Sequence, residues 1–159
     1  MSDALWYFAY GSNMQRATFA SRRRMRPLRA VSGRLHGYRV TFDLPVGPGE
    51  RGVANLAVDA TATTYGALYL LTVEDFDRLD RTEGVDKSYY HRVGVAVIDR
   101  DEQPIEAWTY ISPHGKPGRK PSARYLGLLL EGAAEHDLPD DYVRELRAWE
   151  LAVDERLES

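Results

Sequence analysis

The sequence of 159 residues contains no cysteine, which excludes disulfide bonds, thiol nucleophiles and cysteine-ligated metal. It also has no apolar run approaching 18 residues and no charged-then-apolar leader at its start. We therefore expect a soluble cytoplasmic protein with no membrane partner. The four histidines show no helical i, i+4 pairing, which argues against a zinc site. We expect each histidine on the surface or in a loop.

The net charge of −3 gives no overall basic character. The charges are nevertheless uneven, because eight arginines and no acid lie between Arg16 and Arg39, whereas residues 131–158 are rich in acids. Such a cluster could bind phosphate or nucleic acid, or it could form a solvated surface that pairs with acids elsewhere. Since no aromatic residues are placed to stack on bases, we favour the solvated surface and expect no nucleic-acid partner.

Hydrophobic residues make up 43% of the chain, enough for the core of one domain, and no linker divides residues 1–159. Alternating or β-branched segments predict about six strands, and amphipathic segments predict three or four helices. Most strands follow one another without an intervening helix, which favours an α+β fold with a small mixed β-barrel or strongly twisted sheet. The expected strands are residues 5–10, 34–42, 53–58, 64–71, 89–98 and 105–111.

The most informative segment, residues 7–14, reads YFAYGSNM. An aromatic strand ends at Gly11, and Ser12 with Gln15 fits a capping box that would open a helix. Several backbone N–H groups would then be exposed at one point, which suits an anion or an oxygen that becomes negative during a reaction. The alternative is an ordinary strand-to-helix turn. Neither the dinucleotide fingerprint nor the serine-hydrolase elbow is present.

The second signal is Glu83, placed where a short helix should end. Thr72 is expected to cap this helix and Gly84 to terminate it. A carboxylate at the negative end of the helix dipole is unfavourable, and residues that break such local rules are more common at functional sites. The alternative is a solvated glutamate at a frayed helix end.

Together these segments resemble the γ-glutamylcyclotransferase family of the AIG2-like superfamily. The resemblance rests on the loop ending Tyr10-Gly11-Ser12-Asn13 and on Glu83-Gly84-Val85 with Tyr90 seven residues after the glutamate. Shorter similarities recur at residues 52–54, 108–110 and 122–125. The resemblance implies a fold of that type and no metal or organic cofactor. It also implies a small γ-glutamyl compound as partner and leaves a monomer and a homodimer open.

The family reaction is an internal aminolysis that converts a γ-glutamyl amide into 5-oxoproline and a free amine. The resemblance assigns Glu83 as general acid and base. It assigns substrate binding to the loop and to aromatic positions, namely Tyr10, Gly11, Ser12, Asn13, Tyr90, Tyr110 and Tyr125. The released amine is left open, as is a non-catalytic module of the same fold that binds a γ-glutamyl compound.

Overall fold

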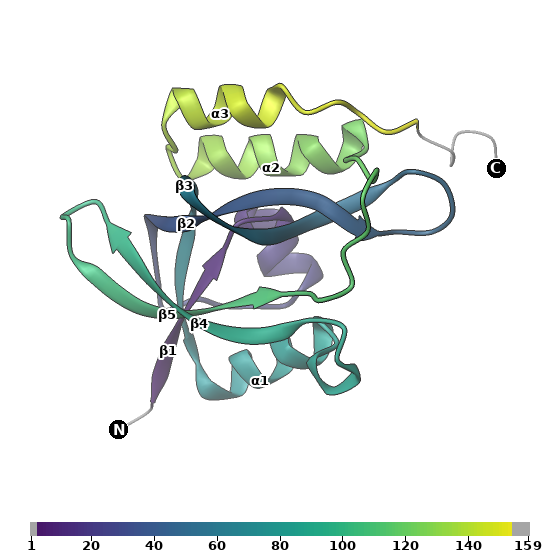
Figure 1. Ribbon diagram of the computed structural model, residues 1–159. Helices are drawn as coiled ribbons and strands as arrows, with labels where there is room; N and C mark the ends of the chain where they lie inside the picture. The colour runs from purple at the N-terminus through teal and green to yellow at the C-terminus, as the bar shows by residue number, and fades with distance from the viewer. Residues whose placement is uncertain (1–2, 154–159) are drawn as a thin grey trace.

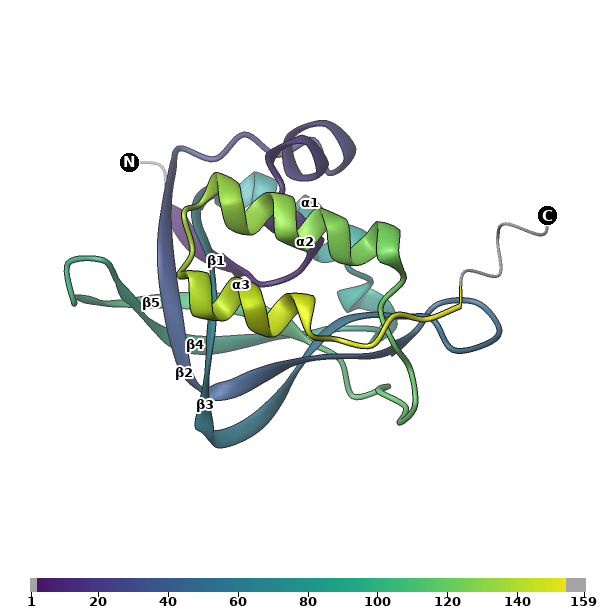
Figure 2. The same cartoon turned by 90° about the horizontal axis from the view of Figure 1, so that it is seen from above.

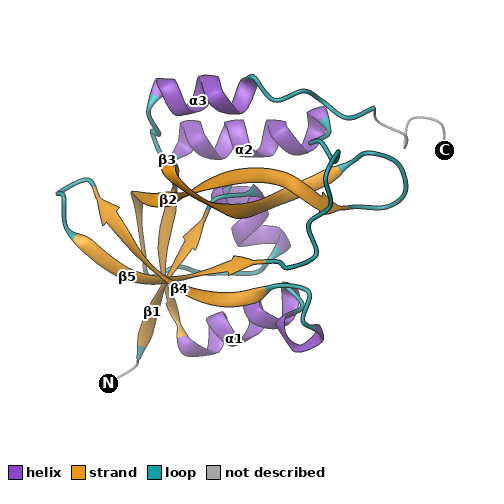
Figure 3. Ribbon diagram, viewed as in Figure 1, coloured by secondary structure: helices purple, strands orange, loops and turns teal. Residues whose placement is uncertain are grey.

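A computed structural model of the protein describes residues 3–153. Five strands close into a barrel in the order β1-β3-β2-β4-β5, and three α-helices pack around it (Figures 1 and 3). The strands are β1 (Ala4–Ala9), β2 (Arg29–Pro45), β3 (Gly52–Thr72), β4 (His91–Asp99) and β5 (Pro104–Ile111). The helices are α1 (Val73–Thr82), α2 (Ala123–Glu135) and α3 (Asp140–Arg147). The α+β barrel expectation is confirmed.

The strand count differs from the expected six because β3 is continuous. Residues 53–58 and 64–71 are both parts of this strand rather than two strands joined by a turn. The pairing of β2 with β3 shifts register between His36 and Tyr38, so that His36 faces Thr63 and Tyr38 faces Val58. The residues between Val58 and Thr63 are therefore a β-bulge, which bends the long hairpin without ending it.

The helices lie on two sides of the barrel. Helices α2 and α3 run side by side over one side, while α1 lies on the opposite side (Figures 1 and 2). Inside, the barrel is filled by fully buried apolar side chains that include Phe8, Leu68 and Val97, and Leu129 of α2 is fully buried as well. No helix within residues 3–153 is long and apolar enough to cross a membrane.

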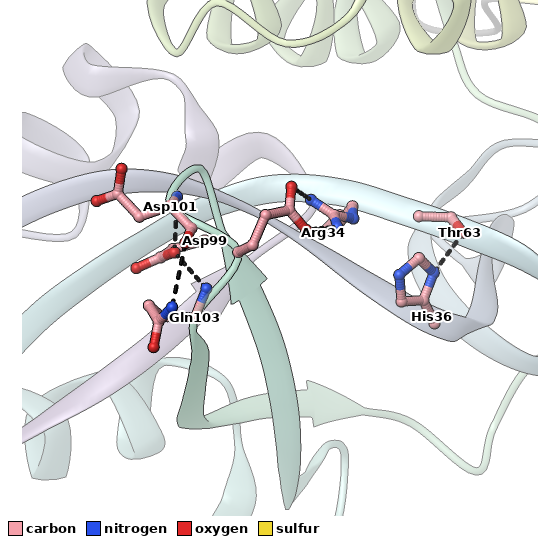
Figure 4. Close-up of polar contacts among 7 residues, drawn as sticks. Arg34, His36, Thr63, Asp99, Asp101 and Gln103 are labelled. Atoms are coloured by element: carbon pink, nitrogen blue, oxygen red, sulfur yellow. Dashed lines mark hydrogen bonds and ion pairs between the residues drawn. The ribbon is translucent and has the colours of Figure 1, made fainter.

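Polar contacts fix the tight turn between β4 and β5 (Figure 4). Asp99 Oδ1 accepts from the N–H groups of Asp101 and Gln103, each at 2.9 Å. Arg34 of β2 forms an ion pair with Glu102 in the same turn. This arginine of the sequence cluster therefore pairs with an acid elsewhere in the fold, as expected for a solvated surface.

One histidine departs from expectation. His36, His91 and His114 are exposed, but His136, at the end of α2, is only 6% exposed. Its Nε2 lies 2.8 Å from the carbonyl oxygen of Met14, which can only accept, so Nε2 carries the proton. Burial lowers the pKa of His136, so the ring is neutral and anchors α2 to the loop that follows β1.

Candidate active site

A cavity of about 230 Å³ brings together the two sequence signals. The loop after β1 forms one part of its wall, and the end of α1 forms another, although some 70 positions separate them in sequence. All eight residues that the sequence singled out line this cavity, namely Tyr10, Gly11, Ser12, Asn13, Glu83, Tyr90, Tyr110 and Tyr125. The structure therefore brings the loop after β1 and Glu83 to one cavity, where the sequence predicts them.

The loop after β1 is a single 3-10 turn, Ser12–Met14, rather than the start of a capped helix. The expected capping box is wrong, because Ser12 lies inside the turn and its side chain makes no capping bond. The backbone bonds of the turn are donated by Met14 and Gln15. Within residues 3–153, the N–H groups of Ser12 and Asn13 take no part in these backbone bonds. The N–H of Ser12 is directed to the hydroxyl oxygen of Tyr125, which leaves the N–H of Asn13 available to a ligand.

Gly11 is favoured by close packing, and its φ of −110° lies outside the left-handed region that favours glycine. A Cβ atom at this position would lie 3.1 Å from Ala54 Cβ and 3.2 Å from the hydroxyl oxygen of Tyr125. The turn is therefore pressed against β3 and α2, and a larger side chain would displace it or its neighbours.

The two ends of helix α1 determine where Glu83 lies in the cavity wall. Thr72 accepts from the N–H of Asp75 at 3.1 Å and so begins the helix as expected. Glu83 is the C-cap residue, and Gly84 follows with φ of 70°, a left-handed conformation that ends the helix. The carboxylate thus leaves the helix at a fixed point, half-buried at the cavity wall.

Asn13 connects the turn to Glu83. Its amide nitrogen donates to Glu83 Oε1 at 3.2 Å and to the hydroxyl oxygen of Tyr7 at 2.9 Å. Its side-chain oxygen, Oδ1, accepts from Arg23 Nε at 3.2 Å. Both ends of the amide are therefore engaged, and this fixes which way it points. Asn13 holds the carboxylate of Glu83 against the turn.

Burial raises the pKa of the Glu83 carboxyl above its ordinary value. The positive charge of Arg23 and the hydrogen bond from Asn13 oppose part of this increase, because both favour the ionised form. A carboxyl whose pKa is raised, and whose anion is still stabilised by a charge and a hydrogen bond, can both take up and return a proton. This balance suits an acid and base in one group.

Two of the expected tyrosines contribute their rings to the cavity but direct their hydroxyl groups elsewhere. Tyr10 donates its hydroxyl to the backbone carbonyl of Tyr110. Tyr110 in turn donates to Asp80 Oδ1 at 2.6 Å, and Asp80 also pairs with Arg92. These two tyrosines therefore form walls of the cavity, and their hydroxyl protons are donated within the protein.

The other two tyrosines meet at the backbone of Ala54. Tyr90 donates to the carbonyl oxygen of Ala54 at 3.0 Å, and the Tyr125 hydroxyl oxygen accepts from the N–H of Ala54 at 3.1 Å. Because Tyr125 accepts here, its O–H is not used in the contact with Ala54. The same hydroxyl also contacts the side chain and the backbone N–H of Ser12, so Tyr125 joins the turn after β1 to β3.

Sequence reasoning missed Tyr7 and Arg23, which also line the cavity. Tyr7 lay within the motif, but strand alternation would place it on the face opposite to that of Tyr10. Arg23 was grouped with a solvated surface. It follows a π-helical turn, Thr18–Arg22, whose buried Phe19 stacks on Tyr69 with ring centres 4.2 Å apart. No sequence signal indicated that this anchor would bring Arg23 to Asn13.

The family model described as the AIG2-like family matches residues 63–146, slightly more than half of the chain. The chain belongs to the AIG2-like family. This AIG2-like protein is 35% identical over 143 residues to the "Gamma-glutamyl cyclotransferase gliK" of Claviceps purpurea. That match covers 84% of this chain but only 64% of the relative, so the chain spans less than two thirds of its length.

Two further comparisons extend over most of both proteins. The AIG2-like chain is 30% identical over 154 residues to the "Gamma-glutamyl cyclotransferase verK" of Clonostachys rogersoniana, covering 79% of this chain and 85% of the relative. A solved structure titled "Gamma-glutamyl cyclotransferase" superposes with a TM-score of 0.80 over 98% of this chain and 96% of that chain. Its sequence identity of 24% supports the shared fold alone.

Proposed function

We propose that this AIG2-like protein converts a γ-glutamyl amide into 5-oxoproline and a free amine by internal aminolysis. The observation that carries the proposal is the half-buried carboxylate of Glu83, hydrogen-bonded to the side chain of Asn13 in the cavity that the turn after β1 also lines. The names of the relatives support the same activity. No serine or cysteine nucleophile is needed, because the nucleophile is the substrate's own α-amine.

The proposed reaction has two steps. The α-amine attacks the γ-carbonyl carbon, a new C–N bond forms, and the Glu83 carboxylate takes a proton from the attacking nitrogen. The tetrahedral oxyanion then collapses and the bond to the leaving nitrogen breaks. The Glu83 carboxylic acid returns its proton to that nitrogen, so the enzyme ends in its starting state. One carboxyl group can perform both transfers because they follow one another.

The turn would stabilise the oxyanion. The N–H of Asn13 is the candidate for this role, and the Ser12 N–H and Tyr125 hydroxyl, which contact each other, lie at the same turn. Loss of a single oxyanion donor typically costs about 3 kcal/mol in transition-state stabilisation. Holding the amine against its own carbonyl can contribute roughly 7 kcal/mol or more, so the shape of the cavity matters as much as the acid.

The test is to incubate the purified protein with γ-glutamyl dipeptides and γ-glutamylamines and to measure 5-oxoproline. We expect formation of 5-oxoproline with release of one amine per turnover. Saturable binding of a γ-glutamyl compound without any product would instead identify a binding module of the same fold. Neither binding nor turnover across the panel would contradict the assignment of the cavity to γ-glutamyl compounds.

A further inference from the structure

A second cavity, of about 220 Å³, adjoins the candidate active site. We call this cavity the arginine annex. The two cavities share four lining residues, namely Ser12, Arg23, Val53 and Tyr125, whereas Glu83, Tyr90 and Tyr110 line only the first. The annex therefore opens on the side of the turn at Ser12 and away from the acid. A substrate held in the first cavity could extend into it.

The annex is lined by four arginines, Arg22, Arg23, Arg51 and Arg124, and by no acidic residue. Arg23 and Arg51 are half-buried, whereas Arg22 and Arg124 are exposed. Within residues 3–153, none of the four forms an ion pair with a carboxylate. The buried Nε atom of Arg51 also has no hydrogen-bond partner there. Such a concentration of unpaired positive charge favours an anion.

The unpaired positive charge is confined to the annex, because a neighbouring lysine is paired with acids. Lys120, on the segment that pairs with Arg51, contacts both Glu50 and Glu150 at 3.2 and 2.5 Å, so its charge is balanced. Arg124 lies in the first turn of α2, which holds no acid. A positive side chain at the positive end of a helix dipole is unfavourable on its own. A bound anion would remove that cost.

We propose that the arginine annex is a subsite that selects substrates whose leaving group carries two or more negative charges. This inference rests on the proposed function, and it names the leaving group that the reaction releases. A single carboxylate can be bound by one arginine in a bidentate manner. Arg23 already contacts Asn13, so Arg22, Arg51 and Arg124 exceed what the single carboxylate of a neutral leaving amino acid requires. A dicarboxylate, such as the glutamate released from γ-glutamylglutamate, matches them better.

The experiment compares γ-glutamylglutamate with γ-glutamylglutamine, which differ only by one charge on the leaving residue. We expect kcat/KM to be about tenfold higher for γ-glutamylglutamate at low salt, and the ratio to fall as salt screens the exposed arginines. Arg124→Gln should lower this ratio, and so should Arg51→Gln if that variant folds. Arg147→Gln on α3, an exposed arginine without an ion pair among residues 3–153, is the matched control and should keep the ratio.

Two results would overturn the proposal. One is a wild-type ratio near one. The other is an equal loss of kcat/KM for both substrates in Arg124→Gln, which would mean that the annex binds the α-carboxylate common to all γ-glutamyl compounds. Calorimetric titration of Glu83→Gln, which the proposed mechanism makes nearly inactive, with the same two compounds gives an affinity ratio that does not depend on turnover. If neither compound is converted, the proposed function fails, while this affinity ratio still decides for or against the annex.

Discussion

Replacement of Glu83 by glutamine tests the proposed proton transfer while changing little else. Glutamine has the same size as glutamate, and its side-chain oxygen can still accept the hydrogen bond that Asn13 donates at 3.2 Å. It cannot take up a proton at neutral pH. Loss of a general acid and base typically lowers the rate by about 10²–10⁴-fold. We therefore expect kcat to fall by about that factor, with the affinity for a γ-glutamyl dipeptide close to wild type.

Stability should move in the opposite direction to activity. Because the pKa of Glu83 is raised in the folded state, the protonated form is favoured by folding and the ionised form is disfavoured. The cost of ionisation appears as the pH rises above the unfolded value near 4.5. Relative to wild type, Glu83→Gln should therefore gain stability as the pH rises through this range and hold that gain at neutral pH.

The assay combines three measurements on Glu83→Gln, namely 5-oxoproline formation, calorimetric titration with one dipeptide, and thermal unfolding between pH 4 and 8. Glu145→Gln on α3 carries the same substitution at an exposed position and should match wild type throughout. Reduced stability of Glu83→Gln at neutral pH would identify a structural carboxylate. Loss of binding as severe as the loss of turnover would mean that Glu83 holds the substrate and does not transfer the proton.

Two further predictions concern the residues around Glu83. Arg23→Gln removes a positive charge that lowers the pKa of Glu83, so the acidic limb of the pH profile of kcat/KM should move to higher pH. Arg23→Lys keeps the charge and should return this limb toward its wild-type position. If the acidic limb does not move in either variant, Arg23 does not act on Glu83. Gly11→Val adds a branched side chain whose Cβ alone would lie 3.1 Å from Ala54 Cβ and 3.2 Å from the Tyr125 hydroxyl oxygen. Binding and turnover should fall together in this variant, as measured by calorimetry and product formation, and intact binding would argue against close approach of the ligand to the turn.

Local signals predicted the parts of the fold whose causes are themselves local. Helix α1 begins after Thr72 and ends before Gly84, because a capping hydroxyl and a left-handed glycine act within one turn of the helix. Ser122 likewise caps α2 by accepting from the N–H of Tyr125 at 3.1 Å. The continuity of β3 was not predictable in this way, since it depends on pairing with β2 across a bulge rather than on its own residues.

The candidate site shows the same division. The loop was recognisable because an aromatic strand stops at Gly11, and Glu83 because it breaks the local rule for a helix end; the resemblance joined them. The role of Arg23 could not be predicted from the sequence, because its contact with Asn13 depends on how the π-helical turn packs. The direction of the Tyr110 hydroxyl was equally hidden, because Asp80, which accepts from it at 2.6 Å, lies on a different element. Hydrogen bonds between distant elements leave no mark in the sequence.

The central claim is that the substrate's own amine, and not water, attacks the γ-carbonyl. Reaction of a γ-glutamyl dipeptide in ¹⁸O-labelled water, followed by mass spectrometry of the products, tests this most directly. Internal aminolysis gives 5-oxoproline without ¹⁸O, together with an equal amount of the released amino acid. Glutamate that carries one ¹⁸O in its side-chain carboxylate would show hydrolysis instead, and would contradict the account.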